Sequence, residues 1–189
     1  MSARNTATEW GWVSKTLHWL IVLAVLGMIA FGLYLDEARE SKSLPISDII
    51  SLFALHKSIG LTILALMIVR LAWRLSNPTP DLPAEMPAWE RLAANGTHWL
   101  FYALLFIVPL SGYVVHTNFP IDSPFFGTFP IPKLFKADEG LRDAASEIHE
   151  LGTWVIVGLV VLHAGAALRH HFMMRDTILI RMLPFTSGR

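Results

Sequence analysis

The sequence predicts an all-α integral membrane protein built as a four-helix bundle. Its 189 residues are 53% hydrophobic and only 16% charged, and the mean hydropathy is +0.49, which is too apolar for a soluble domain of this length. Four apolar segments have about the 20 residues that a helix needs to cross a bilayer. Because no shift in composition marks a second domain, we expect residues 1–189 to form a single membrane domain.

The four expected spans follow one another with polar connections between them. The first span lacks a small-residue cleavage site after it, so we interpret it as a membrane helix and not as a signal peptide. A proline-rich connection, SNPTPDLPAEMP, follows the second span, and a loop rich in proline and phenylalanine follows the third. The tail MMRDTILIRMLP alternates charged and apolar residues, which is typical of a segment along the membrane surface. The expected spans are Leu17 to Leu35, Ile49 to Trp73, Trp89 to Val115 and Glu147 to Phe172.

The distribution of charge predicts the orientation. An even number of spans puts both termini and the connection between the second and third spans on one side of the membrane. That side carries nine basic residues: Arg4, Lys15, Arg70, Arg74, Arg91, Arg169, Arg175, Arg181 and Arg189. The other side carries six, Arg39, Lys42, Lys57, Lys133, Lys136 and Arg142, together with ten of the fifteen acidic residues. Because cytoplasmic loops are enriched in lysine and arginine, we expect both termini in the cytoplasm and an acidic outer face.

Two histidines mark the last span, IHELGTWVIVGLVVLHAGAALRHH. His149 and His163 are fourteen residues apart, which on a helix is about 21 Å along the axis and about 40° around it. They therefore share one face at two depths. An ionisable side chain inside hydrocarbon is costly and by default indicates a functional site. This arrangement suits two cofactors stacked across the membrane.

Each of these histidines has a candidate partner at matching depth on another helix. His18 begins the first span on the side of His163, and His56 lies early in the second span on the side of His149. Histidine is a regular axial ligand of haem iron, and helix bundles build cofactor sites in their cores. The chain has no cysteine, which excludes covalently attached haem. We therefore expect two noncovalent haems, ligated by the pairs His18/His163 and His56/His149.

Metal transport is a rival use of membrane histidines. A transport site would bring carboxylates or further histidines together at one depth. Here the histidines are spread over two depths without acidic residues. This weakens the alternative of a haemless transport or binding protein and leaves it open.

Several segments carry a resemblance to a known family. They are LHWLIVLAVLGMIAFGLYL, LHKSIGLTILALMIVRLAWRLSNPTP, THWLFYALLFIVPLSGY and IHELGTWVIVGLVVLHAGAALRHHFMMRDTILIRMLP. The chain resembles the bacterial cytochrome b561 family from about Trp12 to Pro184, most specifically in R-x-x-W-R-x-x-N-P-T-P and L-H-A-x-A-A-L-x-H-H. The resemblance implies a four-helix protein of the bacterial inner membrane with two b-type haems. It also implies that the haem ligands are His18, His56, His149 and His163.

The resemblance further implies electron transfer between quinone and a partner at the outer face, and some similar proteins are described as superoxide:quinone oxidoreductases. With histidines at both axial positions, neither iron has an open site for oxygen, so outer-sphere electron transfer is the expected task. We expect the outer haem to oxidise superoxide to dioxygen and the inner haem to reduce ubiquinone. No side chain is expected to be catalytic, because the redox chemistry belongs to haem and quinone. The expected partners are quinone, superoxide or a periplasmic redox protein, and the lipid bilayer; no nucleic-acid partner is expected.

Four further residues are candidates near the inner haem. His98, on the third span, has three open roles: it binds a quinone carbonyl or a haem propionate, it replaces His18 as ligand, or it packs. Arg70 and Arg74 either pair with propionates through charge-assisted hydrogen bonds or anchor the helix at the cytoplasmic surface. His170, next to His171, caps the last helix, is solvated at the interface, or contributes to a quinone site.

The acidic outer face opposes the attraction of an anion such as superoxide. Lys57, Lys133, Lys136 and Arg142 offer a local basic patch, and His116 lies at the same end of the third span. The second interpretation is therefore a cytochrome b subunit that exchanges electrons between quinol and a separate dehydrogenase or reductase.

Overall fold

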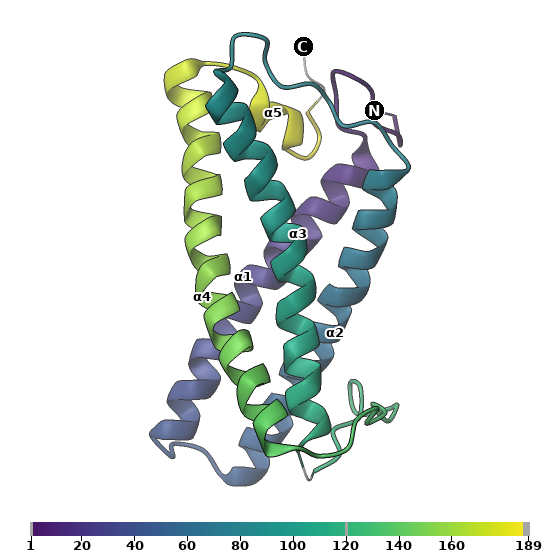
Figure 1. Ribbon diagram of the computed structural model, residues 1–189, viewed down its shortest axis with the longest axis vertical. Helices are drawn as coiled ribbons and strands as arrows, with labels where there is room; N and C mark the ends of the chain where they lie inside the picture. Colours follow the sequence, from purple (N-terminus) through teal and green to yellow (C-terminus); the bar gives the residue numbers. More distant parts are fainter. Residues whose placement is uncertain (1, 120, 187–189) are drawn as a thin grey trace. The chain divides into compact units, whose positions relative to one another are not determined.

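The computed structural model describes residues 2–119 and 121–186, so Arg189, which was counted in the charge balance, lies outside the described residues. Four long helices follow in order: α1 (Trp12–Glu40), α2 (Ile46–Leu75), α3 (Ala88–Thr117) and α4 (Glu139–Arg169) (Figure 1). A π-helical turn, η1 (His170–Met174), and the short α5 (Ile178–Met182) complete the chain. Each long helix is apolar enough to cross a membrane. The all-α prediction with four spans is confirmed.

The helices extend beyond the apolar segments from which they were predicted. The difference is largest for α4, which begins at Glu139 and not at Glu147. Asp138 explains this start, because its Oδ1 accepts a hydrogen bond of 2.7 Å from the backbone N–H of Leu141. This is the contact of an N-cap residue, which satisfies a free amide in the first turn. Hydropathy locates the part of a helix that lies in lipid, whereas capping decides where the helix begins.

The spans point many of their apolar side chains outward. Leu23, Val161 and Leu162 each leave about two thirds of their surface exposed, at 67%, 66% and 69%. Such faces would be unstable in water, but lipid tails are as apolar as leucine. The exposed surface of the helices is therefore suited to a bilayer.

The chain folds as two compact units. The first contains the described residues of Met1–Ile21, Leu66–Leu104 and Val155–Arg189, and the second those of Val22–Ala65 and Leu105–Trp154. His18 and His163 belong to the first unit, and His56 and His149 to the second. Each expected histidine pair therefore lies within one unit.

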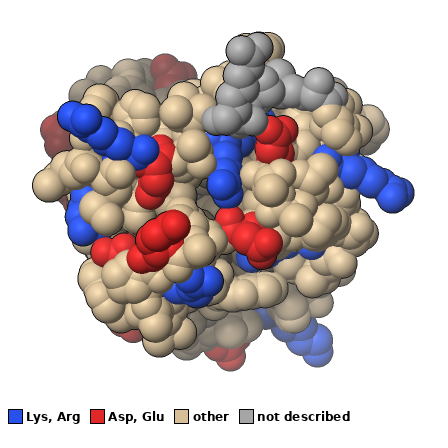
Figure 2. Space-filling view, turned by 90° about the horizontal axis from the view of Figure 1, so that it is seen from above, with Lys and Arg blue, Asp and Glu red and all other residues tan. Residues whose placement is uncertain are grey.

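Polar contacts hold the terminal segments onto the first unit. The Asn5 side chain is buried; its Nδ2 donates to the Pro78 carbonyl at 2.9 Å and its Oδ1 accepts from Ser14 Oγ at 2.7 Å. Trp19 Nε1 donates to the Met182 carbonyl at 2.9 Å, which joins α1 to α5. The face drawn in Figure 2 places lysine and arginine beside aspartate and glutamate. Among the described residues of that face, positive and negative side chains are interspersed.

In the second unit, the connection between α3 and α4 packs on the helix ends. The Phe126 N–H donates to Ser58 Oγ at 2.9 Å, and the Tyr113 hydroxyl donates to the Pro132 carbonyl at 2.6 Å. Lys133 Nζ pairs with Asp122 at 2.8 Å. Because Lys133 donates a hydrogen bond to the Asp122 carboxylate and stabilises its charged form, the pKa of Asp122 is below its ordinary value.

Candidate functional site

The second unit brings His56 of α2 and His149 of α4 together. Their ring centroids are 6.1 Å apart, and the ring planes meet at 62°. Phe31 of α1 lies beside His56, with 6.0 Å between the ring centroids. The pair predicted from the sequence is therefore adjacent in the structure.

A backbone carbonyl fixes the tautomer of His149. Its Nδ1 is 2.8 Å from the carbonyl oxygen of Val108. Since a carbonyl only accepts, Nδ1 carries the proton and Nε2 keeps its lone pair. Ser111 Oγ donates to the same carbonyl at 2.8 Å. A histidine that binds a metal almost always donates its other ring N–H in this way, so His149 is prepared to act as a ligand.

A glycine makes room for the His149 ring. A Cβ added to Gly112 of α3 would lie 3.0 Å from His149 Cε1, so alanine there would press on the imidazole. The sequence analysis missed Gly112, whose only signal was its place in the PLSGY stretch at the outer half of the third span.

His56 has a buried nitrogen available for a further partner. Within the described residues, its Nδ1 is buried and has no hydrogen-bond partner. A buried polar group without a partner costs about 1–3 kcal/mol. Within the described residues, the ring of His56 is therefore not held by a hydrogen bond, in contrast to the ring of His149.

The first unit brings three histidines together. The ring centroids of His18 of α1 and His163 of α4 are 6.4 Å apart, with 71° between the planes. His98 of α3 is closer to His163, at 5.5 Å, and Phe101 lies at the same distance of 5.5 Å. The predicted pair is adjacent, His98 lies beside it, and the structure adds Phe101.

The two arginines expected beside this pair have different surroundings. Arg70 Nη2 is 3.2 Å from His18 Nδ1, and its Nε donates to the Tyr102 hydroxyl at 3.4 Å. The guanidinium of Arg74 lies over aromatic rings, 5.4 Å from the centroid of Trp99 and 5.6 Å from that of Tyr102. Arg70 therefore faces the histidines, whereas Arg74 makes cation–π contacts.

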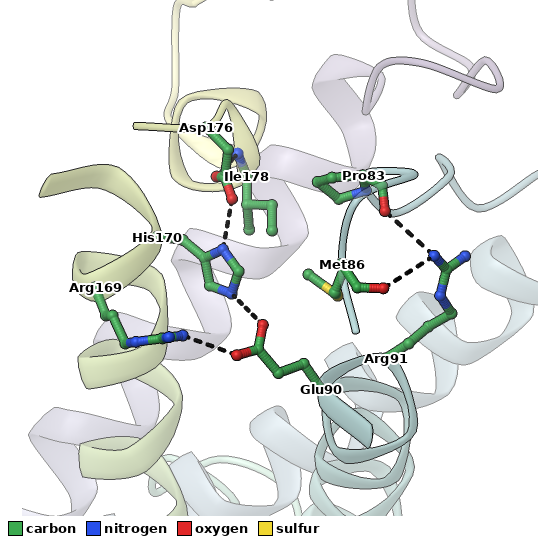
Figure 3. Close-up of polar contacts among 8 residues, drawn as sticks. All are labelled: Pro83, Met86, Glu90, Arg91, Arg169, His170, Asp176 and Ile178. Carbon is green, nitrogen blue, oxygen red and sulfur yellow. Dashed lines mark hydrogen bonds and ion pairs between the residues drawn. The ribbon is translucent and has the colours of Figure 1, made fainter. Parts of the chain in front are cut away.

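His170 belongs to a separate polar cluster in the first unit. Its Nδ1 is 2.5 Å from Asp176 Oδ2, and its Nε2 is 3.8 Å from Glu90 Oε2 (Figure 3). Arg169 Nη1 donates to the other oxygen of Glu90 at 3.0 Å. The sequence analysis missed Glu90 and Asp176 as partners, because Glu90 is eighty residues from His170 in the chain and no local spacing links them.

The expected basic patch at the outer end is only partly free of acidic partners. Lys133 pairs with Asp122 at 2.8 Å, and Arg142 pairs with Asp143 at 3.0 Å. Lys57 Nζ instead donates to Ser123 Oγ at 3.1 Å and lies 5.2 Å from the Phe119 ring. Ser123 and Lys133 also line a hollow of about 570 Å³ in the α3–α4 connection.

His116 is a further histidine of the second unit that lies apart from the pair. Its side chain is almost fully buried, with 2% of the residue surface exposed. Tyr113 is its aromatic neighbour, with 6.3 Å between the ring centroids. This burial is consistent with packing at the end of α3.

The two histidine pairs have the separation that a shared iron requires. A metal–imidazole bond is about 2 Å long, so two imidazoles on opposite sides of one metal have centroids roughly 6 Å apart. The observed 6.1 Å and 6.4 Å agree with this. Four apolar helices with histidine pairs at this separation fit the class of membrane cytochromes of the b type, in which histidines hold haem noncovalently.

Comparison with known proteins identifies the family. The family model described as "Prokaryotic cytochrome b561" matches residues 9–185. Cytochrome b561 homolog 2 of Escherichia coli K12 is 36% identical, and the match covers 100% of this chain and 98% of that protein. The probable superoxide oxidase CybB of Yersinia pestis is 32% identical over 91% of this chain and 94% of that protein. The chain belongs to the prokaryotic cytochrome b561 family.

Membership in this family establishes the general properties of the protein. It is a multi-pass inner-membrane protein that binds b-type haem and transfers electrons across the membrane. Because members of this family bind haem, the alternative of a haemless transport or binding protein no longer applies.

Proposed function

We propose that the chain is a di-haem cytochrome b that carries electrons from the periplasmic face to the quinone pool. In this proposal His56 and His149 ligate the outer haem iron, His18 and His163 ligate the inner one, and residues 1–189 act as one membrane domain. Haem supplies an iron that changes between the ferric and ferrous states and so carries one electron at a time. The protein holds the groups in place and excludes water around them.

The observation that carries the proposal is the orientation of His149. Its Nδ1 donates to the Val108 carbonyl at 2.8 Å, which leaves Nε2 as the only nitrogen that can bind iron. The neighbouring ring of His56 lies at the separation that a shared iron needs, 6.1 Å between centroids.

For the inner pair, Arg70 supports a role beside a haem propionate. Because a guanidinium only donates, its contact of 3.2 Å makes His18 Nδ1 the acceptor. Ligation of iron through Nε2 requires the proton on Nδ1 instead, so Arg70 must turn to another acceptor when haem is bound. A propionate carboxylate is the acceptor that an arginine prefers. His98 lies beside His163, with 5.5 Å between the ring centroids, and His18 is the partner already proposed for His163. We therefore assign His98 to a propionate or quinone contact.

We propose superoxide as the electron donor and ubiquinone as the acceptor. Two superoxide ions give up one electron each and become dioxygen, while one ubiquinone takes two electrons and two protons and becomes ubiquinol. The name of the Yersinia relative, a probable superoxide oxidase, supports this donor. Lys57 supports it as well, because this cation follows His56 in α2 and has a serine and not a carboxylate as hydrogen-bond partner. The excess of basic residues on the side of the termini supports cytoplasmic termini.

A second candidate is a cytochrome b subunit that exchanges electrons between quinol and a separate dehydrogenase or reductase. The ion pairs of Lys133 and Arg142 favour it, because they neutralise two of the four cations expected to attract superoxide.

One experiment separates the two candidates. Purified protein in liposomes with ubiquinone receives a pulse of potassium superoxide under argon, and the haem α-band and the quinol are measured. The first candidate predicts reduced haems and accumulating quinol in the wild-type protein. It also predicts that His163→Ala keeps an outer haem that superoxide reduces, without quinol formation. Haems that stay oxidised with superoxide but are reduced by a quinol analogue would establish the second candidate instead.

A further inference from the structure

Four ionisable side chains meet in the first unit, about two helical turns beyond His163. Glu90 comes from the first turn of α3, Arg169 from the end of α4, His170 from η1, and Asp176 from the segment before α5 (Figure 3). We propose that Asp176, His170 and Glu90 form a proton relay that supplies the protons consumed when quinone is reduced. The proposal rests on the quinone reduction put forward above.

The contacts of His170 are those of a relay. One ring nitrogen, Nδ1, is 2.5 Å from Asp176 Oδ2, and the other, Nε2, faces Glu90 Oε2 at 3.8 Å. A neutral imidazole carries a proton on one nitrogen and accepts on the other. At 2.5 Å it can exchange a proton with Asp176 directly. The 3.8 Å to Glu90 Oε2 is longer than a hydrogen bond, so release of a proton to Glu90 requires these two side chains to approach each other.

Burial gives the relay a direction. The exposed fraction of the side chain is 21% for Asp176, 11% for His170 and 10% for Glu90. Asp176 is thus in contact with water, whereas Glu90 Oε2 is buried and has no hydrogen-bond partner within the described residues. A proton from water would enter at Asp176 and arrive at Glu90 Oε2, which is free to receive it.

The other oxygens of the two carboxylates hold the relay in place. Glu90 Oε1 accepts from Arg169 at 3.0 Å, and Asp176 Oδ1 accepts from the backbone N–H of Ile178 at 3.0 Å. Each carboxylate therefore uses one oxygen for position and turns the second toward His170.

The backbone around His170 is unusual in a way that serves this cluster. The helix widens to a π-helical turn at His170, and Arg175 then adopts a left-handed conformation with φ of 56°. A non-glycine residue rarely adopts this conformation, and π-helical turns are frequent at functional sites. The left-handed residue reverses the chain so that Asp176 faces His170.

The relay lies near the inner histidine pair, where the proposed function places the reduction of ubiquinone. His170 follows His163 by seven residues, which on a helix is the same face and about 10 Å further along. Ubiquinone that accepts two electrons from the inner haem must also take two protons, which bond to its two carbonyl oxygens. The relay would provide each proton from water, and Asp176 would be reprotonated by water after each transfer.

The test uses the full-length protein with its haems in liposomes. The variants are Asp176→Asn, His170→Gln and Glu90→Gln, which keep side-chain size and remove proton transfer. Glu85→Gln is the matched control, because Glu85 is an exposed carboxylate in the same connection that ends at α3. The haems are reduced beforehand, and their reoxidation is followed by stopped flow, once with ubiquinone-1 and once with ferricyanide, which takes an electron without a proton. Haem content and thermal stability are measured for every variant.

We expect the three variants to keep their haems and their rate with ferricyanide. With ubiquinone-1 we expect reoxidation at least tenfold slower than in the wild type, a larger solvent deuterium isotope effect, and partial rescue of Asp176→Asn by formate. We expect Glu85→Gln to behave as the wild type. Variants that match Glu85→Gln with ubiquinone-1 would overturn the relay, as would equal losses with both oxidants, which would make the cluster a structural anchor. If wild-type haems react with ferricyanide but not with ubiquinone-1, the proposed function itself is wrong and the relay with it.

Discussion

At the scale of single residues, the histidine pairs depend on neighbours that position each ring. Val108 and Ser111 fix His149 through one carbonyl, and Gly112 leaves space for the ring. Arg70 faces His18. The four proposed ligands followed from their depth and face along the helices, whereas these supporting residues required the packed structure.

Replacement of Gly112 by alanine tests the packing around His149. The new Cβ would lie 3.0 Å from His149 Cε1, so we expect the ring to move and the haem content to fall from two per chain toward one. Gly158→Ala is the control, because a Cβ there meets no atom within 4 Å. A pyridine haemochromogen assay measures the haem content of both variants. Two haems in the Gly112→Ala protein would show that the ring tolerates the methyl group.

Replacement of Arg70 by glutamine tests its role toward a propionate. Loss of a positive charge beside the inner haem favours the ferric state. We therefore expect a redox titration to show a lower midpoint potential for one haem and an unchanged potential for the other. Arg74→Gln serves as the comparison, because Arg74 lies over Trp99 and Tyr102. Equal midpoint potentials in Arg70→Gln and the wild type would argue that Arg70 is an anchor.

At the scale of elements, glycines set how closely the helices pack. Gly152 lies three residues after His149 on α4, where a small residue either admits a haem or lets helices approach. The structure favours close packing, because a Cβ on Gly152 would lie 2.6 Å from Val108 Cγ2. The same α3 residue thus supplies the carbonyl for His149 and the contact for α4.

Replacement of Gly152 by alanine should therefore destabilise the contact between α3 and α4. Overpacking of this kind costs about 1–3 kcal/mol. The double variant Gly152→Ala/Val108→Ala should recover most of the loss, because it removes the opposing methyl group and keeps the carbonyl. Thermal unfolding followed by the haem Soret band measures both proteins. No recovery in the double variant would place the defect elsewhere.

At the scale of the whole molecule, the proposal requires two haems per chain and both termini in the cytoplasm. We expect a pyridine haemochromogen assay to give two b-type haems and a low-spin reduced spectrum, because two histidines fill both axial positions of each iron. One haem per chain would contradict the assignment of two pairs.

A reporter protein fused to the C-terminus tests the orientation. A reporter that is active only in the periplasm should stay silent, because nine of the fifteen basic residues lie on the side of the termini. An active reporter would reverse the assignment of inner and outer haems.

The sequence by itself determined the helical membrane fold and the two histidine pairs. Hydropathy over about 20 residues and the 3.6-residue helical repeat are local properties, so they place each span and put His149 and His163 on one face. The tertiary structure alone decided which groups complete the sites. Glu90 and His170, or Val108 and His149, are far apart in the chain and meet only because helices pack side by side. Such contacts depend on the rotation and offset between helices, which no periodicity within one segment specifies.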